Sequence, residues 1–142
     1  MSENTVVVKK IISARREEVF EAFTNPEVMS KWFYPFDDMS VDVTNTLEIG
    51  GSYKLLMYGK DGELYTHVGE YQEIEPPGKL VFTWNSDFVQ NTIVTVTFHV
   101  ADGGTEVTIA HDLLPDDKMC EDHRGGWMGC VNRLEALLLG DN

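Results

Sequence analysis

The sequence has little positive charge, little cysteine and no long apolar run. It contains 11 Lys and Arg residues against 24 Asp and Glu in 142 residues, which gives a formal net charge of −13 and a pI near 4.5. A surface this acidic repels nucleic acid and anionic lipid, so we expect neither as a partner. No apolar run approaches the roughly 20 residues that cross a bilayer, and the first residues do not form a secretory leader. The sequence therefore predicts a soluble protein that does not bind a membrane.

The two cysteines, Cys120 and Cys130, fall in a segment predicted to be a single helix. Ten helical residues separate them by about 15 Å, which is too far for a disulfide. Two free thiols and no export signal predict a cytoplasmic location. Cys120 and His123 lie one helical turn apart, and His111 and Cys130 could join them as zinc ligands, but the paired knuckles that hold structural zinc are missing. We therefore expect no metal and no cofactor.

Composition and length indicate one globular domain. The apolar fraction is 42 %, which is ordinary for globular proteins, and a chain of this length buries roughly two-thirds of its unfolded surface. The sequence has no internal repeat, low-complexity tract or linker-like segment. Residues 1–142 are therefore predicted to form a single domain with a core from about residue 6 to residue 139.

Hydrophobic periodicity predicts a strand and two helices in the first third of the chain. Residues 5–12 are β-rich, and the helix that follows begins near Ala14, with Ser13 as its candidate N-cap. This helix ends at Pro26, because proline disfavours a helical conformation in the residue before it. Residues 27–33 are predicted to form a second, short helix with one apolar side.

From about residue 40 the apolar residues alternate, which is typical of strands with one buried face. Turn residues, including an Asp-Gly pair, separate the alternating runs. The best-defined runs are 51–58, 64–74, 79–84, 93–100 and 105–111. We expect about six consecutive antiparallel strands joined by short turns. The last element is a long amphipathic helix that follows the acidic residues 116–117 and reaches Leu139, with Gly140 as candidate C-cap.

Several short motifs along residues 6–139 resemble, in order and spacing, those of one known family. They are Asn25-Pro26-Glu27 with Lys31-Trp32-Phe33, Ile49-Gly50-Gly51-Ser52-Tyr53 with Asp61-Gly62, Gly69 with the run from Glu73 to Trp84, Val94 to Phe98 with Gly104-Thr105 and His111, and finally His123, Gly126, Trp127, Val131 and Leu134. By these motifs the chain resembles the Hsp90-ATPase-activator-homologue-1-like (AHSA1-like) family of the START/Bet v 1-like (SRPBCC) superfamily.

The resemblance implies an α+β helix-grip (Bet v 1-like) fold. In that fold a curved antiparallel sheet wraps around a long C-terminal helix and encloses a cavity, in the order β-α-α-β6-α. The superfamily includes lipid and hormone carriers, polyketide cyclases and co-chaperone domains. The resemblance therefore defines the fold and the kind of site more closely than the function.

The inward faces of the strands and of the final helix supply candidates for the cavity wall. Strand parity places apolar and aromatic side chains opposite the helix: Tyr53, Leu55, Met57, Phe82, Trp84, Val96 and Phe98, with Trp127 and Leu134 on the helix itself. Tyr65, His67 and His111 are the candidate polar groups that orient a ligand. The same side chains could instead fill a packed core, with each histidine bonded to backbone or water.

The leading hypothesis is a small-molecule binding protein that holds an apolar or aromatic ligand, such as a lipid, between the sheet and the C-terminal helix. One alternative is a cyclase or dehydratase on a polyketide-like substrate, with His67 or His111 as acid or base, although no carboxylate partner is evident for either. We assign no catalytic residue. Another alternative is a co-chaperone-like protein-interaction module. The acidic excess is expected to be mostly solvated surface, with a cationic ligand or partner as a further alternative.

Overall fold

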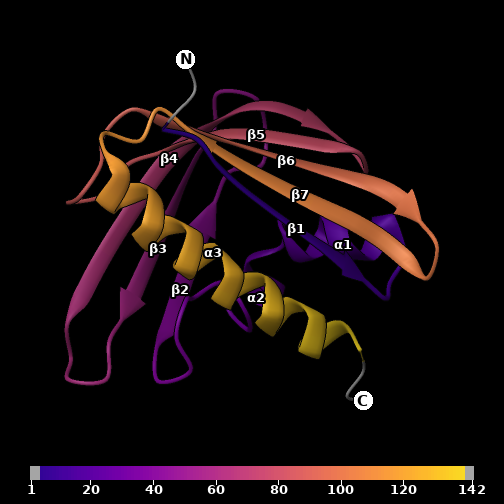
Figure 1. Cartoon of the computed structure of the whole chain (residues 1–142), viewed down its shortest axis with the longest axis horizontal. Helices are drawn as coiled ribbons and strands as arrows, with labels where there is room; N and C mark the ends of the chain where they lie inside the picture. Colours follow the sequence, from indigo (N-terminus) through magenta and orange to yellow (C-terminus); the bar gives the residue numbers. More distant parts are fainter. Residues whose placement is uncertain (1–3, 140–142) are drawn as a thin grey trace.

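A seven-stranded antiparallel sheet curls around a long C-terminal helix in the computed structural model, which describes residues 4–139 (Figure 1). The elements in chain order are β1 (Val6–Ile12), α1 (Arg16–Ala22), α2 (Pro26–Met29), β2 (Ser40–Asn45), β3 (Ser52–Tyr58), β4 (Leu64–Glu75), β5 (Lys79–Trp84), β6 (Thr92–Ala101), β7 (Gly104–Asp112) and α3 (Asp117–Leu138). The strands are arranged in the order β1-β7-β6-β5-β4-β3-β2, and all neighbouring pairs are antiparallel.

This architecture confirms the predicted α+β helix-grip fold. One strand and two short helices come first, six consecutive strands follow, and α3 ends the chain on the concave side of the half-barrel. The strands from β2 to β7 pair in sequence order, so each follows its neighbour through a short connection. β1 completes the sheet by pairing with β7, from Val6 opposite His111 to Ile12 opposite Thr105.

The start of α1 differs from the prediction. Ser13 is not the N-cap, because β1 continues to Ile12 and the chain then turns, with the Ala14 N–H donating to the Ile12 carbonyl at 2.8 Å. Arg15 is the N-cap instead, and its backbone N–H donates to the Glu18 carboxylate at 3.4 Å. The Glu18 carboxylate thus accepts the hydrogen bond at the start of the helix that the Ser13 side chain was predicted to accept.

The second helix is shorter than predicted, since α2 covers Pro26–Met29 rather than residues 27–33. The Asn25 side chain caps it by accepting from the Glu27 N–H at 3.0 Å. Beyond Met29 the backbone tightens, and the Trp32 N–H donates to the Met29 carbonyl three residues before it. The apolar spacing that predicted a helix up to residue 33 therefore continues through turns, and these turns still bury Trp32 and Phe33. The candidate C-cap Gly140 lies outside the described residues.

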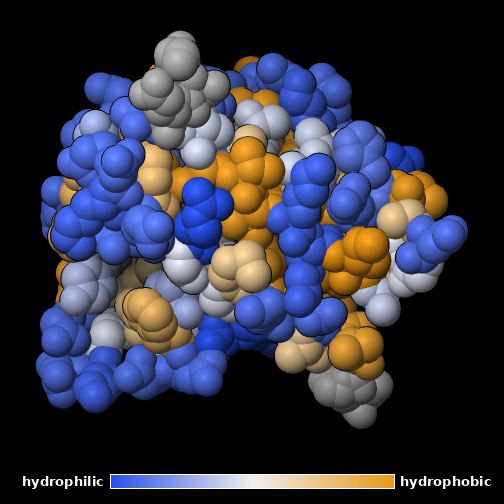
Figure 2. Space-filling view, viewed as in Figure 1, coloured by the Kyte–Doolittle hydropathy of each residue, from blue (hydrophilic) through white to orange (hydrophobic). Residues whose placement is uncertain are grey.

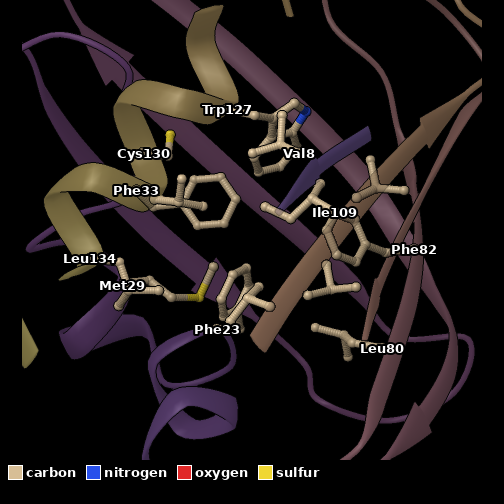
Figure 3. Close-up of a cluster of buried hydrophobic side chains, with 14 of the residues drawn as sticks. Val8, Phe23, Met29, Phe33, Leu80, Phe82, Ile109, Trp127, Cys130 and Leu134 are labelled. Atoms are coloured by element: carbon tan, nitrogen blue, oxygen red, sulfur yellow. The ribbon is translucent and has the colours of Figure 1, made fainter. Parts of the chain in front are cut away.

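The core fills the concave side of the sheet and is rich in aromatic rings (Figure 3). Phe23, which follows α1, packs edge-on against Phe98 of β6, with the ring centroids 5.4 Å apart. Phe33 contacts Trp127 of α3 at 5.6 Å and stacks on Trp84 of β5 at 6.3 Å. Edge-on and offset arrangements of this kind are the favoured geometries for aromatic pairs. The first two helices thus close one end of the concave face, and α3 spans the rest.

Gly69 of β4 lets three strands approach closely at one point of the sheet. It lies opposite Tyr53 of β3, whose hydroxyl donates to the Thr83 carbonyl of β5 at 2.5 Å. A Cβ atom at Gly69 would lie 1.9 Å from the Thr83 carbonyl oxygen and 2.7 Å from the Tyr53 hydroxyl. The missing side chain is therefore what admits the tyrosine and its hydrogen bond.

We expect Gly69→Ala to lower the free energy of unfolding by about 1–3 kcal/mol, because the added methyl overpacks this contact. Gly125→Ala in α3 is the matched control: nothing lies within 4 Å of its Cβ position, and helix propensity favours alanine by about 1 kcal/mol. Urea denaturation followed by circular dichroism measures both. Equal stability of the Gly69 variant and the parent chain would show that the strands relax freely at this point.

Candidate functional site

A pocket of about 380 Å³ opens between the sheet and the N-terminal half of α3. Its walls come from β3, β4, β5 and α3, from the β3–β4 turn and from the two loops that precede β2 and β6. On the face shown in Figure 2 the surface is recessed between α3 and the β3–β4 hairpin. The lining is mostly apolar and includes six aromatic side chains, Phe33, Phe36, Tyr65, Trp84, Phe88 and Trp127.

Five of the twelve predicted wall residues line this pocket. They are Met57, Tyr65, His67, Trp84 and Trp127. The strand residues among them lie near the turn of the β3–β4 hairpin or at the end of β5, and Trp127 faces them from α3. The structure thus brings together the aromatic residues of the helix and the sheet, with one of the two histidines.

The other seven predicted wall residues do not line it. Tyr53, Leu55 and Phe82 surround a separate cavity of about 10 Å³, which is at the limit for one water molecule. Val96, Phe98, His111 and Leu134 are completely buried in the core. Strand parity places six of these on the concave face, and helical periodicity turns Leu134 toward them. Phe23, after α1, packs over that face on Phe98. His111 is instead enclosed by the rings of Trp84, Trp127 and His123. Parity therefore identifies the face and not the part of it that stays open.

Several lining residues were not predicted as wall residues. Phe36 and Phe88 lie on the two rim loops and are 62 % and 59 % exposed. His123, Gly126 and Cys130 line the pocket from α3. The loop residues follow no period that sequence analysis could use. The helix residues do carry a signal, because they repeat every three or four positions together with Trp127.

The rim loop before β2 is fastened to α3. Arg133 donates to the Tyr34 carbonyl at 2.6 Å, its guanidinium lies 4.5 Å from the centroid of the Tyr34 ring, and it pairs with Asp37. Gly129 allows the close approach, since a Cβ there would lie 2.1 Å from the Pro35 carbonyl oxygen. This side of the pocket is therefore held by backbone contact, a cation–π contact and an ion pair.

A chain of hydrogen bonds crosses the inner wall of the pocket. The Trp127 indole N–H donates to His111 Nδ1 at 3.1 Å, so His111 carries its proton on Nε2 and donates it to the Thr92 hydroxyl at 2.9 Å. Thr92 then donates to the Trp84 carbonyl at 2.7 Å. Burial lowers the pKa of His111 to about 3, so the ring is neutral. Both of its nitrogens are occupied within the protein, and this histidine is a structural link.

Two nitrogen atoms in the pocket walls lack such partners. His67 Nδ1 and Trp84 Nε1 are buried and have no hydrogen bond within residues 4–139. Their rings lie 4.8 Å apart. Burial lowers the pKa of His67 to about 4, which leaves its ring neutral at physiological pH. A buried donor without a partner costs about 1–3 kcal/mol, so the wall carries an unmet capacity for hydrogen bonding.

His123 is a second histidine of the pocket. Its Nδ1 lies 2.8 Å from the Met119 carbonyl oxygen, and a carbonyl only accepts, so Nδ1 carries a proton. In the neutral ring this leaves Nε2 as an acceptor. The ring packs edge-on against that of His111, with the centroids 5.0 Å apart. The pocket therefore contains one histidine whose outer nitrogen is available to a ligand.

Cys120 and Cys130 are both free thiols, which confirms that they form no disulfide. Burial raises the pKa of Cys130 to about 12, so its thiol stays protonated and is a poor nucleophile. Within residues 4–139 no group of three or more His, Cys, Asp or Glu side chains is arranged to hold a metal ion. Cys130 therefore lines the pocket as a neutral, weakly polar group.

A curled antiparallel sheet, a long C-terminal helix and a pocket between them define a protein of the helix-grip, Bet v 1-like class. The family model described as "Activator of Hsp90 ATPase homolog 1-like protein" matches residues 13–139, and the chain belongs to this family. Comparison with curated proteins gave no match. None of the helices within residues 4–139 has the length and apolar character that a membrane span requires.

Solved structures of similar fold cover almost the whole chain. Protein CV1439 from Chromobacterium violaceum is 26 % identical with a TM-score of 0.89, over 97 % of this chain and 99 % of its own. An AHSA1-like protein from Aeromonas hydrophila, solved by NMR, is 24 % identical with a TM-score of 0.81, over 97 % and 96 %. CalU16 from Micromonospora echinospora is 21 % identical with a TM-score of 0.77, over 97 % and 76 %. The last two show similarity of fold alone.

The hydrogen-bond chain predicts strong coupling between His111 and Trp127. We expect His111→Leu and Trp127→Phe each to lower the free energy of unfolding by about 1–3 kcal/mol, because each leaves a buried polar partner unpaired. The double variant should lose less than the sum of the two, by about 0.5–3 kcal/mol. Urea denaturation of all four proteins gives this coupling. Strictly additive losses would mean that the two side chains do not act as a unit.

The lowered pKa of His67 predicts a loss of stability in mild acid. An unfolded histidine binds a proton below about pH 6.5, whereas folded His67 does so only near pH 4. Between these values the unfolded state binds more protons, so the free energy of unfolding falls as the pH falls. His67→Gln should remove up to about 1.4 kcal/mol per pH unit from that slope, and His99→Gln at an exposed site of β6 should not. Identical slopes for the parent and His67→Gln would contradict the assignment.

Proposed function

We propose that the protein binds an apolar or aromatic small molecule in the pocket between the sheet and α3. The observation that carries the proposal is the combination of an aromatic lining with two buried, unpartnered nitrogens, His67 Nδ1 and Trp84 Nε1. Ligand sites of small-molecule binding proteins combine apolar walls with a few polar groups in this manner. The volume of about 380 Å³ lies within the range of such sites.

The energetics favour a ligand that is largely apolar. Each Å² of apolar surface removed from water contributes roughly 25 cal/mol, against which the loss of translational and rotational freedom must be set. An acceptor group on the ligand that reaches the Trp84 indole N–H would also relieve the cost of that unpaired donor. We therefore expect polar contacts to orient the ligand and the aromatic walls to supply most of the affinity.

An acid–base enzyme has less support. Efficient proton transfer at neutral pH needs a group in contact with substrate whose pKa is near neutral. His111 has both nitrogens bonded within the protein, and burial holds the pKa of His67 near 4. These two histidines, the candidates for a cyclase or dehydratase, therefore suit a binding wall better than a catalytic pair.

A co-chaperone-like interaction module also has less support. Such a role needs a large contiguous apolar patch on the surface. On the face in Figure 2 the apolar residues are interrupted by hydrophilic ones. Among the exposed apolar side chains, Phe36 and Phe88 belong to the pocket rim. The two exposed phenylalanines of the described residues thus both lie at the pocket.

The proposal predicts that filling the pocket from α3 abolishes binding. Gly126 lines the pocket, and its Cβ position meets only the Pro35 side chain, at 3.7 Å. Gly126→Leu should therefore be tolerated by the fold and reduce ligand affinity at least tenfold. Gly125→Leu is the matched control on the same helix, since its Cβ position has nothing within 4 Å.

Native mass spectrometry of the freshly purified protein, before and after denaturation, detects a ligand that is carried through purification. Chemical-shift mapping with fatty acids, sterols and polyphenols then compares the parent, Gly126→Leu and Gly125→Leu proteins. We expect the resonances of Trp84 and Trp127 to shift in the parent and in the Gly125 variant only. If no compound moves these resonances in the parent protein, the proposed function loses its basis.

A further inference from the structure

The open side of the pocket carries an excess of negative charge. Four exposed carboxylates line it: Asp38 from the loop before β2, Asp61 and Glu63 from the β3–β4 turn, and Asp122 from α3. Lys60 is the single Lys or Arg among the described lining residues. The carboxylates come from three separate segments of the chain, so the fold gathers them at the same opening.

Three of these carboxylates are free of ion pairs within the described part of the chain. Asp122 is paired with Lys118 on the preceding turn of α3, at 3.1 Å. Asp38, Asp61 and Glu63 make no ion pair there, and the Glu63 carboxylate accepts only a long bond of 3.4 Å from the Asp61 backbone N–H. Their charge is therefore available to a partner that arrives from solution.

Aromatic rings line the same pocket as these carboxylates. Phe88 is exposed at the rim and its ring centroid lies 6.3 Å from that of Tyr65. Further in, the rings of Trp84 and Trp127 lie 5.2 Å apart. The face of an aromatic ring attracts a cation within about 6 Å, and tryptophan does so best. Acidic side chains and aromatic rings that line one pocket form an environment suited to an organic cation.

The unpartnered histidine of the pocket wall, His67, adds no opposing charge at neutral pH. Burial lowers the pKa of His67 to about 4, and the ring is therefore neutral. The protein as a whole has a formal charge of −13, so its field attracts cations and repels anions over the surface. Fatty acids and other anionic amphiphiles would meet repulsion at the opening.

Building on the proposed binding function, we propose that the ligand is a lipophilic cation, with an apolar or aromatic body that fills the pocket and an amine or quaternary ammonium group at its opening. The body takes the place of water against the aromatic walls. The charged end lies among Asp38, Asp61, Glu63 and Asp122 and stays partly hydrated. The carboxylates thus select the charge of the ligand, while the walls select its shape.

Three probes with one naphthalene body test this inference: naphthylethyl-trimethylammonium, naphthylethanol and naphthylpropionate. Tryptophan fluorescence and chemical-shift mapping give the affinity of each for the intact protein. We expect the cation to bind at least tenfold more tightly than the alcohol, and the carboxylate to bind most weakly. The preference should shrink as ionic strength rises from about 0.01 M to about 1 M, because salt screens charges at an exposed opening.

A charge-neutralising variant assigns the preference to the opening. Asp61→Asn with Glu63→Gln should weaken binding of the cation about fivefold or more and leave the affinity for the alcohol unchanged. Glu48→Gln with Glu70→Gln removes the same net charge at exposed sites that do not line the pocket, and it should leave both affinities close to those of the parent. Gly126→Leu should weaken binding of all probes.

The outcomes separate this inference from the proposed function. Equal affinity for the three probes, with binding lost in Gly126→Leu, would overturn the cation preference and leave the binding pocket supported. A cation preference that survives in both Asp61→Asn/Glu63→Gln and Gly126→Leu would place the cation elsewhere on the acidic surface and overturn the inference. Failure of all three probes to bind the parent protein would count against the inference and the proposed function together.

Discussion

The hydrogen-bond chain from Trp127 to the Trp84 carbonyl is the contact on which the pocket depends. It joins α3 to three strands through His111 of β7 and Thr92 of β6. An indole N–H can only donate and a carbonyl can only accept, so the direction of the chain is fixed at both ends. That direction requires a neutral His111, and burial keeps the ring neutral. All three hydrogen bonds form when α3 lies at this position on the sheet. The position of α3 in turn places the Trp127 ring beside that of Trp84 in the pocket wall.

The fold could be predicted from the sequence because the patterns that indicate it are local and repeated. The alternation from residue 93 to residue 100 matches β6 to within a residue at each end, and three of the five connections between β2 and β7 carry Asp-Gly or Pro-Pro-Gly. The helix ends were less predictable. Ser13 and Arg15 both precede the acidic turn of α1, and the choice between them depends on how far β1 pairs with β7. That pairing is a long-range contact which no local pattern encodes.

The pocket was predictable only in part, for a related reason. Alternation shows that Leu55, Phe98 and Trp84 share the concave face, but it does not show that Phe23 packs on Phe98 and leaves Trp84 at an open wall. Phe36 enters the rim because Arg133, almost a hundred residues later, fastens its loop to α3. Contacts of this kind become visible only when the helices are placed on the sheet.

The concave face has a packed end, which stabilises the fold, and an open end, which forms the pocket. Residues such as Phe98 and Leu134 are completely buried and maintain the fold, whereas Gly126 and the rim loops shape the open end with few neighbours in the core. Changes at Gly126 and at the exposed rim residues Phe36 and Phe88 therefore carry little penalty for folding, unlike changes at the buried Trp127. A scaffold built in this way can diverge in what it recognises while its architecture persists, even between chains that share only a quarter of their residues.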